Sequence, residues 1–305
     1  MQTTAQIRKL IAAAKRRDTL FAVLGIFALA LGITTFVTLF VNMVLDGHER
    51  FTSEFFMSFP SRRAESAGIL SAWVGSLAVM TVTALVAVPI GVAAGVYLEE
   101  YARKNLLTDI IEINISNLAG VPSIIYGLLA LGIFVYTFGL GQSIQTAGLT
   151  LALLILPIVI VATREAIRGI PQHIREGAYG LGATKWQMVK DHILPYSLPG
   201  ILTGIIIGMA RAIGETAPII TIGALTFIAF LPPAPISPDA PFISFEWLSS
   251  PFTVMPIQMF NWTSRPEEAF HANAAAAGFI LVLMTLTMNG LAIWLRAKLR
   301  KNIKW

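Results

Sequence analysis

Long runs of apolar residues, separated by short polar segments, dominate the pattern along this chain of 305 residues. A helix that crosses the hydrocarbon core of a membrane needs about 20 mostly apolar residues. Six runs reach or approach that length, so the pattern predicts an all-α membrane protein with six transmembrane helices. The six runs cover residues 20–45, 68–98, 110–138, 147–163, 200–230 and 274–295.

The composition supports a membrane protein and excludes several other classes. The chain is 55% hydrophobic and 13% charged, with a mean hydropathy of +0.72, whereas soluble domains carry about 25% charged residues. It has no cysteine, which excludes disulfides and thiolate metal sites. It has neither a G-x-x-x-x-G-K-[ST] loop nor an H-E-x-x-H pair. These absences argue against an enzyme, and we expect no metal or cofactor on this chain.

Basic residues are distributed unevenly among the polar segments. Seventeen of the 22 Lys and Arg residues lie before the first run or after the second, fourth or sixth. Four lie in the other connections, and Arg211 lies inside a run. Because cytoplasmic loops carry the excess of Lys and Arg, we predict a multi-pass protein of the bacterial cytoplasmic membrane with both termini inside. The first run is too long for a cleaved secretory signal, and basic loops explain the high pI without a nucleic-acid partner.

Two charged residues, Arg211 and Glu215, interrupt the fifth run. Arg211 stands about twelve residues into that run, which predicts a depth near the middle of the bilayer, where a charge usually faces a cavity. Its planar fork suits an oxyanion, and Glu215 would hold Arg211, or an arginine of a partner chain, while the path is empty. A structural ion pair within the membrane is the alternative. Pro218 removes a backbone donor and predicts a bend at this site.

A second polar interruption falls in the third run, where Gly120 and Pro122 break the helical pattern. Irregular backbone at membrane depth is tolerated where it is buried or lines a wet cavity. A proline kink without any contact to a solute explains the same pattern equally well. The residues predicted to line a solute path are Asn117, Ser123, Arg211, Glu215 and Thr216.

The polar segment after the fourth run has the pattern of a helix, a tight turn and a second helix. A short helical run follows Pro171, glycines at 180 and 182 permit the turn, and helical periodicity resumes over 183–193. We expect Pro195 to end this element. A short helix that leaves the membrane and lies in a groove of a soluble partner is a known mode of recognition.

This segment resembles the EAA loop of ABC importer permeases, in which E-A-A is followed by three residues, Gly, nine residues and I-x-L-P. Here E-G-A occupies 176–178, Gly182 has the required spacing, and H-I-L-P closes the pattern at 192–195, with Gly and His as mild departures. The resemblance implies a coupling helix that docks on an ATP-binding subunit. A solvated loop without a partner is the alternative. The implied coupling residues are Glu176, Ala178, Gly182, Ala183 and Trp186.

Three further segments resemble the PstA-type permeases of phosphate-specific ABC importers, which have the type I (MetI-like) fold. They are AGVPSIIYGL at 119–128, ARAIGETAPII at 210–220 and MPIQMFNWTSRPEE at 255–268, and the likeness extends over roughly 68–300. The resemblance implies transport of inorganic phosphate and a heterodimer with a PstC-type permease. It also implies a PstB-type ATPase dimer, which binds ATP and Mg²⁺, and an external PstS-type phosphate-binding protein. In that family an arginine and a glutamate in these helices matter for phosphate passage.

The chain divides accordingly. We expect a cationic, lipid-facing cytoplasmic segment at 1–18, a first span with its periplasmic connection at 19–67, a permease domain at 68–298 that includes the coupling loop 164–199, and a cytoplasmic tail at 299–305. Two rival functions stay open. One is a permease of the same architecture for sulfate or molybdate, and the other is a stand-alone secondary transporter or channel.

Overall fold

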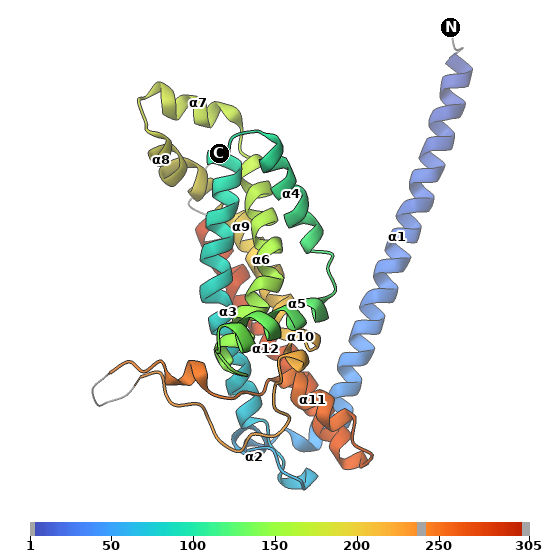
Figure 1. The fold of residues 1–305 in the computed structure, drawn as a ribbon. Coiled ribbons are helices and arrows are strands. Elements are labelled where there is room, and N and C mark those ends of the chain that lie inside the picture. Colours follow the sequence, from blue (N-terminus) through green and yellow to red (C-terminus); the bar gives the residue numbers. More distant parts are fainter. Residues whose placement is uncertain (1–3, 237–241, 301–305) are drawn as a thin grey trace.

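The computed structural model describes residues 4–236 and 242–300, which are mostly helical and contain no strand beyond one isolated bridge. Five long helices run along a common direction (Figure 1): α1 (Thr4–Gly47), α3 (Leu70–Val96), α6 (Ile144–Arg168), α9 (Leu194–Gly214) and α12 (Glu268–Arg300). The shorter α-helices are α2 (Ser53–Met57), α4 (Leu106–Leu118), α5 (Ser123–Ala130), α7 (Gln172–Gly180), α8 (Lys185–Gln187), α10 (Ala217–Thr221) and α11 (Met255–Thr263). Short 3-10 turns η1 (His48–Arg50), η2 (Ala64–Ser66) and η6 (Glu246–Ser249), and π-turns η3 (Tyr97–Tyr101), η4 (Leu131–Thr137) and η5 (Met188–Ile193), complete the chain.

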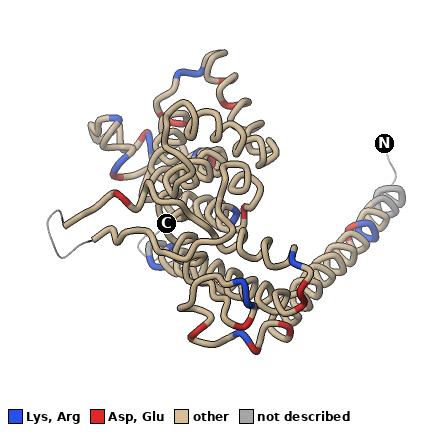
Figure 2. Tube along the Cα trace, turned by 60° about the horizontal axis from the view of Figure 1, so that its bottom comes forward, with Lys and Arg blue, Asp and Glu red and all other residues tan. Residues whose placement is uncertain are grey.

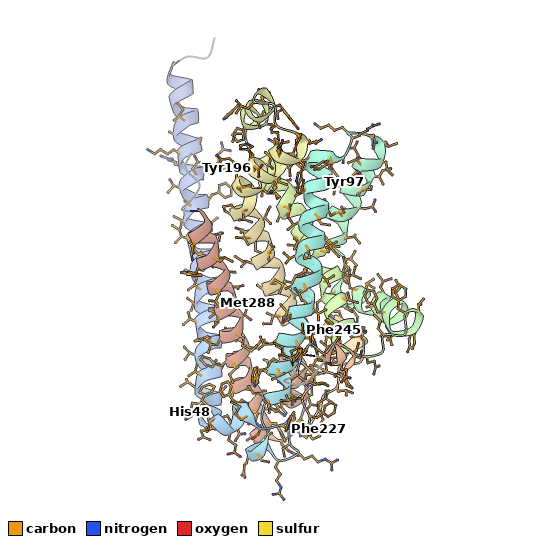
Figure 3. The ribbon with its side chains drawn as sticks, turned by 90° about the vertical axis from the view of Figure 1, so that its left-hand side faces the viewer. His48, Tyr97, Tyr196, Phe227, Phe245 and Met288 are labelled. Carbon is orange, nitrogen blue, oxygen red and sulfur yellow. The ribbon has the colours of Figure 1, made fainter. Side chains whose placement is uncertain are left out.

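The beginning of α1 and the last described turns of α12 lie at the same end of the bundle as α7 and α8 (Figure 1). We call this the α7 end, and the opposite end, which holds α2 and α11, the α11 end. Figure 3 places Tyr97 and Tyr196 at the α7 end and His48 and Phe227 near the α11 end. In Figure 2 charges on α1 occur only near its two ends. Which end faces the cytoplasm stays a prediction from the Lys and Arg distribution.

The predicted all-α membrane architecture is confirmed, with one change in the third run. Five stretches are long and apolar enough to cross a membrane, and a sixth passes only as a bent pair. That pair joins α4 to α5 and η4, with a bend of 106°. The break falls at Gly120–Pro122, as the sequence predicted, but the bend is far larger than a simple proline kink.

The expected span over 200–230 is wrong at both ends. The helical stretch begins at Lys185 and ends at Gly214, and after α10 the chain is irregular to residue 230. Pro218 opens the new helix α10, and Gly223 has a φ of +90°, so both residues interrupt a continuous helix. Hydropathy does not detect these interruptions of the helix, because the residues after Gly214 are still mostly apolar.

The expectation that Pro195 ends the loop element is also wrong. Helical backbone continues from Lys185 through η5 into α9, in which Pro195 occupies one of the first two positions. The π-turn η5 immediately before it changes the hydrogen-bond register and accommodates the proline.

The core is built around α6, which packs between α3 and α9. Small residues allow these backbones to approach closely. A Cβ on Gly95 of α3 would lie 2.6 Å from Thr163 Cβ of α6, and one on Gly204 of α9 would collide with Ala162. The small residues of α3 thus allow it to pack closely within the bundle.

The first helix stands apart from this core. Residues 4–18 continue α1 without a break, and α1 meets the bundle only near the α11 end, along α12. There the rings of Phe40 and Phe279 lie 5.1 Å apart, and Gly47 approaches the backbone of Ala276. Most of the expected tail at 299–305 lies outside the described residues.

Candidate functional site

Arg211 lies in the last turn of α9, not midway along a span. The helix ends at Gly214, and Glu215 has extended backbone, with φ −74° and ψ 122°. The bend predicted from Pro218 is therefore present, and it places Glu215 just beyond the helix end. The expected span over 200–230 has Arg211 near its middle, whereas the helical stretch runs from Lys185 to Gly214 and has Arg211 near its end.

The two charges contact each other. Arg211 Nε donates to Glu215 Oε1 at 3.0 Å, and the side chains are 36% and 17% exposed. This is the only hydrogen bond of the Arg211 guanidinium to the described residues, and it uses the Nε side. The two terminal nitrogens, Nη1 and Nη2, therefore remain available to a ligand or to another chain.

Packing of α5 on α10 fixes the surroundings of Arg211. Gly127 of α5 lies so close to Pro218 and Thr221 of α10 that a Cβ would collide with both. Tyr126 donates its hydroxyl hydrogen to the Leu118 carbonyl at 2.8 Å, which ties α5 back to α4 across the break. The broken third span thus buttresses the end of α9.

The remaining predicted path residues are not gathered in one place. Thr216 follows Glu215 and is half-buried, and Ser123 begins α5. Asn117 lines a separate polar cavity of about 420 Å³, together with Glu112, Arg164 and neighbouring residues of α4 and α6. The residues are therefore divided between the α9–α10 junction, the α4–α5 break and this cavity.

The cavity beside Glu215 is small. It measures about 10 Å³ and lies among residues of α3, α6 and α9, including Ser76, Leu151 and Ile213. About one water needs that volume, so an oxyanion has no room there. An oxyanion bound by the Nη groups of Arg211 must therefore lie outside this cavity, and the Arg211 side chain is partly exposed, at 36%.

The segment between α6 and α9 forms the predicted helix, turn and helix. Gly182 has a φ of +82°, a conformation that favours glycine. Glu176 and Tyr179 on α7 are exposed, and Leu181 directly after it is 91% exposed. Sequence reasoning did not select Tyr179 or Leu181, although two bulky apolar residues in a polar loop are a signal for an interface.

Two of the predicted coupling residues point inward instead. Ala178 is buried in a small cluster with Ile167, Met188 and Ile193, and Ala183 packs on the same cluster. These residues hold α7 against the ends of α6 and α9. Trp186 is exposed and lines an apolar groove of about 670 Å³ beside the end of α3.

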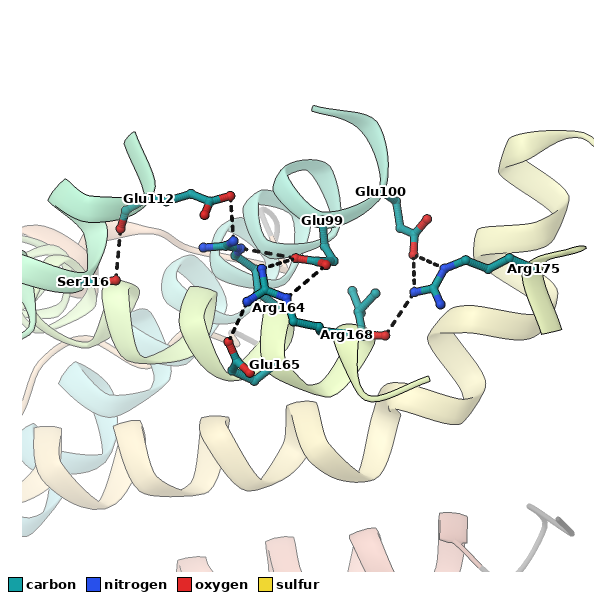
Figure 4. Close-up of polar contacts among 9 residues, drawn as sticks. Glu99, Glu100, Glu112, Ser116, Arg164, Glu165, Arg168 and Arg175 are labelled. Atoms are coloured by element: carbon teal, nitrogen blue, oxygen red, sulfur yellow. Dashed lines mark hydrogen bonds and ion pairs between the residues drawn. The ribbon is translucent and has the colours of Figure 1, made fainter. Parts of the chain in front are cut away.

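A network of ion pairs lies beneath α7 (Figure 4), and no pattern in the sequence predicted it. Arg164 of α6 binds Glu112 of α4 at 2.6 Å and lies 3.6 Å from Glu99 of η3. Arg168 binds the same Glu99 at 3.0 Å. Arg175 of α7 binds Glu100 at 2.8 Å. From the sequence, these arginines counted only toward membrane orientation.

The sequence and the fold match known proteins. The chain matches the family described as binding-protein-dependent transport system inner membrane component over residues 87–304. The probable ABC transporter permease protein YqgI of Bacillus subtilis (strain 168) is 30% identical, covering 92% of this chain and 95% of that relative. The phosphate transport system permease protein PstA 1 of Mycobacterium tuberculosis (strain ATCC 25618 / H37Rv) is 30% identical, covering 75% and 70%.

A solved structure shares the fold. The bacterial alginate ABC transporter in complex with its alginate-pentasaccharide-bound periplasmic protein has a TM-score of 0.63 at 14% identity, covering 93% of this chain and 96% of that chain. At this identity the likeness concerns the fold alone. Taken with the family match over most of the sequence, it shows that the chain belongs to the binding-protein-dependent transport system inner membrane components, the permease subunits of ABC importers.

Proposed function

We propose that this permease moves inorganic phosphate inward across the cytoplasmic membrane. The observation that carries the proposal is the geometry of Arg211, whose Nε is held by Glu215 while Nη1 and Nη2 stay available. A planar fork with two parallel donors matches an oxyanion. The relatives named as PstA permeases support phosphate as the cargo.

In this proposal Glu215 positions the arginine. Its carboxylate repels an anion from the Nε side, so the cargo meets only the Nη edge. Thr216 serves beside this edge at the α9–α10 junction, Ser123 at the α4–α5 break, and Asn117 at the polar cavity with Arg164. An anion that binds the guanidinium replaces part of the water that hydrates this partly exposed side chain.

The path itself requires a second chain. The Arg211 side chain is only partly exposed, and the cavity beside Glu215 is too small for the cargo. A permease of an ABC importer works with an ATPase and a binding protein. We infer a PstC-type permease as the facing subunit, a PstB-type ATPase dimer on the α7 face at Glu176, Tyr179 and Leu181, and a PstS-type protein at the α11 end.

The test is reconstitution of the complete complex in lipid vesicles. The chain is co-purified with its second permease and ATPase, and the binding protein is added with phosphate. We expect ATP hydrolysis and uptake of labelled phosphate to rise together, with no competition from excess sulfate. Stimulation by sulfate or molybdate instead would assign another oxyanion, and uptake by the purified chain without the ATPase would favour a secondary transporter.

A further inference from the structure

Arg175 fastens α7 to the rest of the bundle. Its Nε and Nη2 donate to Glu100 Oε1 at 3.0 and 2.8 Å, Nη1 donates to the Ile170 carbonyl at 2.8 Å, and Nη2 also donates to the Ile167 carbonyl at 3.1 Å. The side chains of Arg175 and Glu100 are only 14% and 7% exposed. One guanidinium thus joins α7, the end of α6 and the π-turn η3.

The adjacent residue in η3 continues the connection. Glu99 binds Arg168 and lies 3.6 Å from Arg164, both on α6. Arg164 is 8% exposed and binds Glu112 of α4 at 2.6 Å. Ion pairs therefore connect α7 to α4 through two consecutive glutamates, as the dashed lines in Figure 4 follow.

We propose that a relay of five charged residues carries displacement of α7 to α4, with Glu99 and Glu100 at its centre. The relay consists of Arg175, Glu100, Glu99, Arg164 and Glu112. It rests on the proposed function, in which an ATPase moves α7. Glu99 and Glu100 bind arginines of α6 and α7. They therefore act by positioning these helices.

The Arg175–Glu100 link of the relay is largely buried, which makes it stiff, whereas Glu112 at the other end is 31% exposed. Separating a buried ion pair leaves an uncompensated charge in a medium of low dielectric constant, which costs far more than breaking an exposed pair. The paired elements therefore move together when α7 moves. Helix α4 leads through the break at Gly120–Pro122 to α5, and α5 packs on α10 beside the Arg211 site. The relay thus connects the ATPase side of the permease with the proposed solute path.

The test compares single and double variants in the reconstituted complex. Glu100→Gln removes the charge at nearly constant shape and breaks the link to α7. Glu112→Gln breaks the link to α4. The matched control is Glu165→Gln, which removes an ion pair with Arg168 at 3.3 Å, where both partners are more than half exposed. Basal and phosphate-stimulated ATP hydrolysis are measured for each, with co-purification of the subunits as the check on assembly.

We expect Glu100→Gln to leave basal hydrolysis unchanged and to lower the stimulation about fivefold or more, the usual scale of coupling between distant sites. Glu165→Gln should behave as wild type, and Glu100→Asp, which keeps the charge, should retain part of the stimulation. If the two links act in series, breaking either one interrupts the same connection. The double variant Glu100→Gln/Glu112→Gln should then lose no more of the phosphate stimulation than the worse single variant.

Two outcomes would overturn the relay. One is normal stimulation in Glu100→Gln, and the other is independent, additive losses in the double variant, which would indicate two separate structural anchors. Failure of the cargo proposal is distinguishable from both. A wild-type complex stimulated only by sulfate contradicts phosphate transport and tests the relay with sulfate in the same way. Stimulation by molybdate alone has the same two consequences, and a wild-type complex that none of the three anions stimulates contradicts both proposals.

Discussion

The pair of Arg211 and Glu215 spans a local break in the backbone. Helix α9 ends at Gly214, and the Glu215 carboxylate accepts from Arg211 Nε across the helix end. The two nitrogens that could grip an oxyanion in parallel stay unoccupied by the described residues. The arrangement keeps a charged pair close to an apolar bundle while preserving the part of the guanidinium that recognises anions.

Replacement of this arginine gives a direct prediction. Arg211→Gln should lower phosphate uptake by about 10- to 150-fold, because a hydrogen bond to a charged group contributes about 1.5–3 kcal/mol. Arg211→Lys should be intermediate, since it keeps the charge and loses the fork. Uptake in vesicles gives the measurement, and unchanged co-purification shows that the complex assembles. Normal uptake by Arg211→Gln would remove the assignment.

Sequence reasoning identified this pair and misjudged where the helix that carries it begins and ends. Arg211 and Glu215 are conspicuous because charges are rare in an apolar run. Their position along the helix was misjudged because hydropathy records composition and ignores backbone continuity. The ion pairs of Arg164 and Arg175 were missed for another reason: their partners lie more than 50 residues away in the sequence, and only the tertiary fold brings them together.

At the scale of elements, the contact between α5 and α10 supports the site. It depends on Gly127, whose backbone lies against Pro218 and Thr221. Nothing of this kind surrounds Gly132 in the adjoining η4, where a Cβ would meet no atom within 4 Å. The two glycines therefore provide a matched comparison within one broken span.

Gly127→Ala should force α5 away from α10 and destabilise the chain by about 1–3 kcal/mol, the usual cost of overpacking. Gly132→Ala should change stability by less than about 0.5 kcal/mol. The thermal midpoint of the detergent-solubilised complex and its phosphate uptake measure the two effects. Equal behaviour of the two variants would contradict the close approach of α5 and α10.

Elements with strong local signals were predictable. The loop helices and the turn at Gly182 follow from glycine placement and helical periodicity, and the packed α3 follows from its small residues. The route of the chain through Pro195 was not predictable, because the π-turn that accommodates it has no clear pattern in the sequence. The 106° bend between α4 and α5 likewise needs the packing against α10 to define its size.

At the scale of the whole molecule, the bundle of α3 to α12 holds the site and α1 lies beside it. The contact of α1 with α12 includes Phe40, Met43 and Gly47, and the α1 side chains toward the α7 end are mostly exposed. The family match begins at residue 87, after α1. The six apolar runs predicted the number of spans well, but runs alone do not show which helix lies outside the core.

Steric conflict at Gly47 should separate α1 from α12. A Cβ at Gly47 would lie 2.6 Å from the Ala276 nitrogen, whereas none at Gly25 would meet an atom within 4 Å. We expect Gly47→Leu to reduce disulfide crosslinking of a Phe40→Cys/Phe279→Cys pair strongly, and Gly25→Leu to leave it intact. The absence of native cysteine makes the assay free of background. Equal crosslinking in the Gly47→Leu and Gly25→Leu variants would argue against this contact between α1 and α12.

The short contact of α1 with α12, here called the seam, also has a consequence for how such chains diversify. A helix attached along a few residues is nearly a module, since beyond the seam it needs only to be apolar and long enough for the bilayer. Its outer surface is therefore free to drift, to be exchanged between related chains, or to be adapted to a neighbour in the assembly, while the machinery of transport stays unaltered.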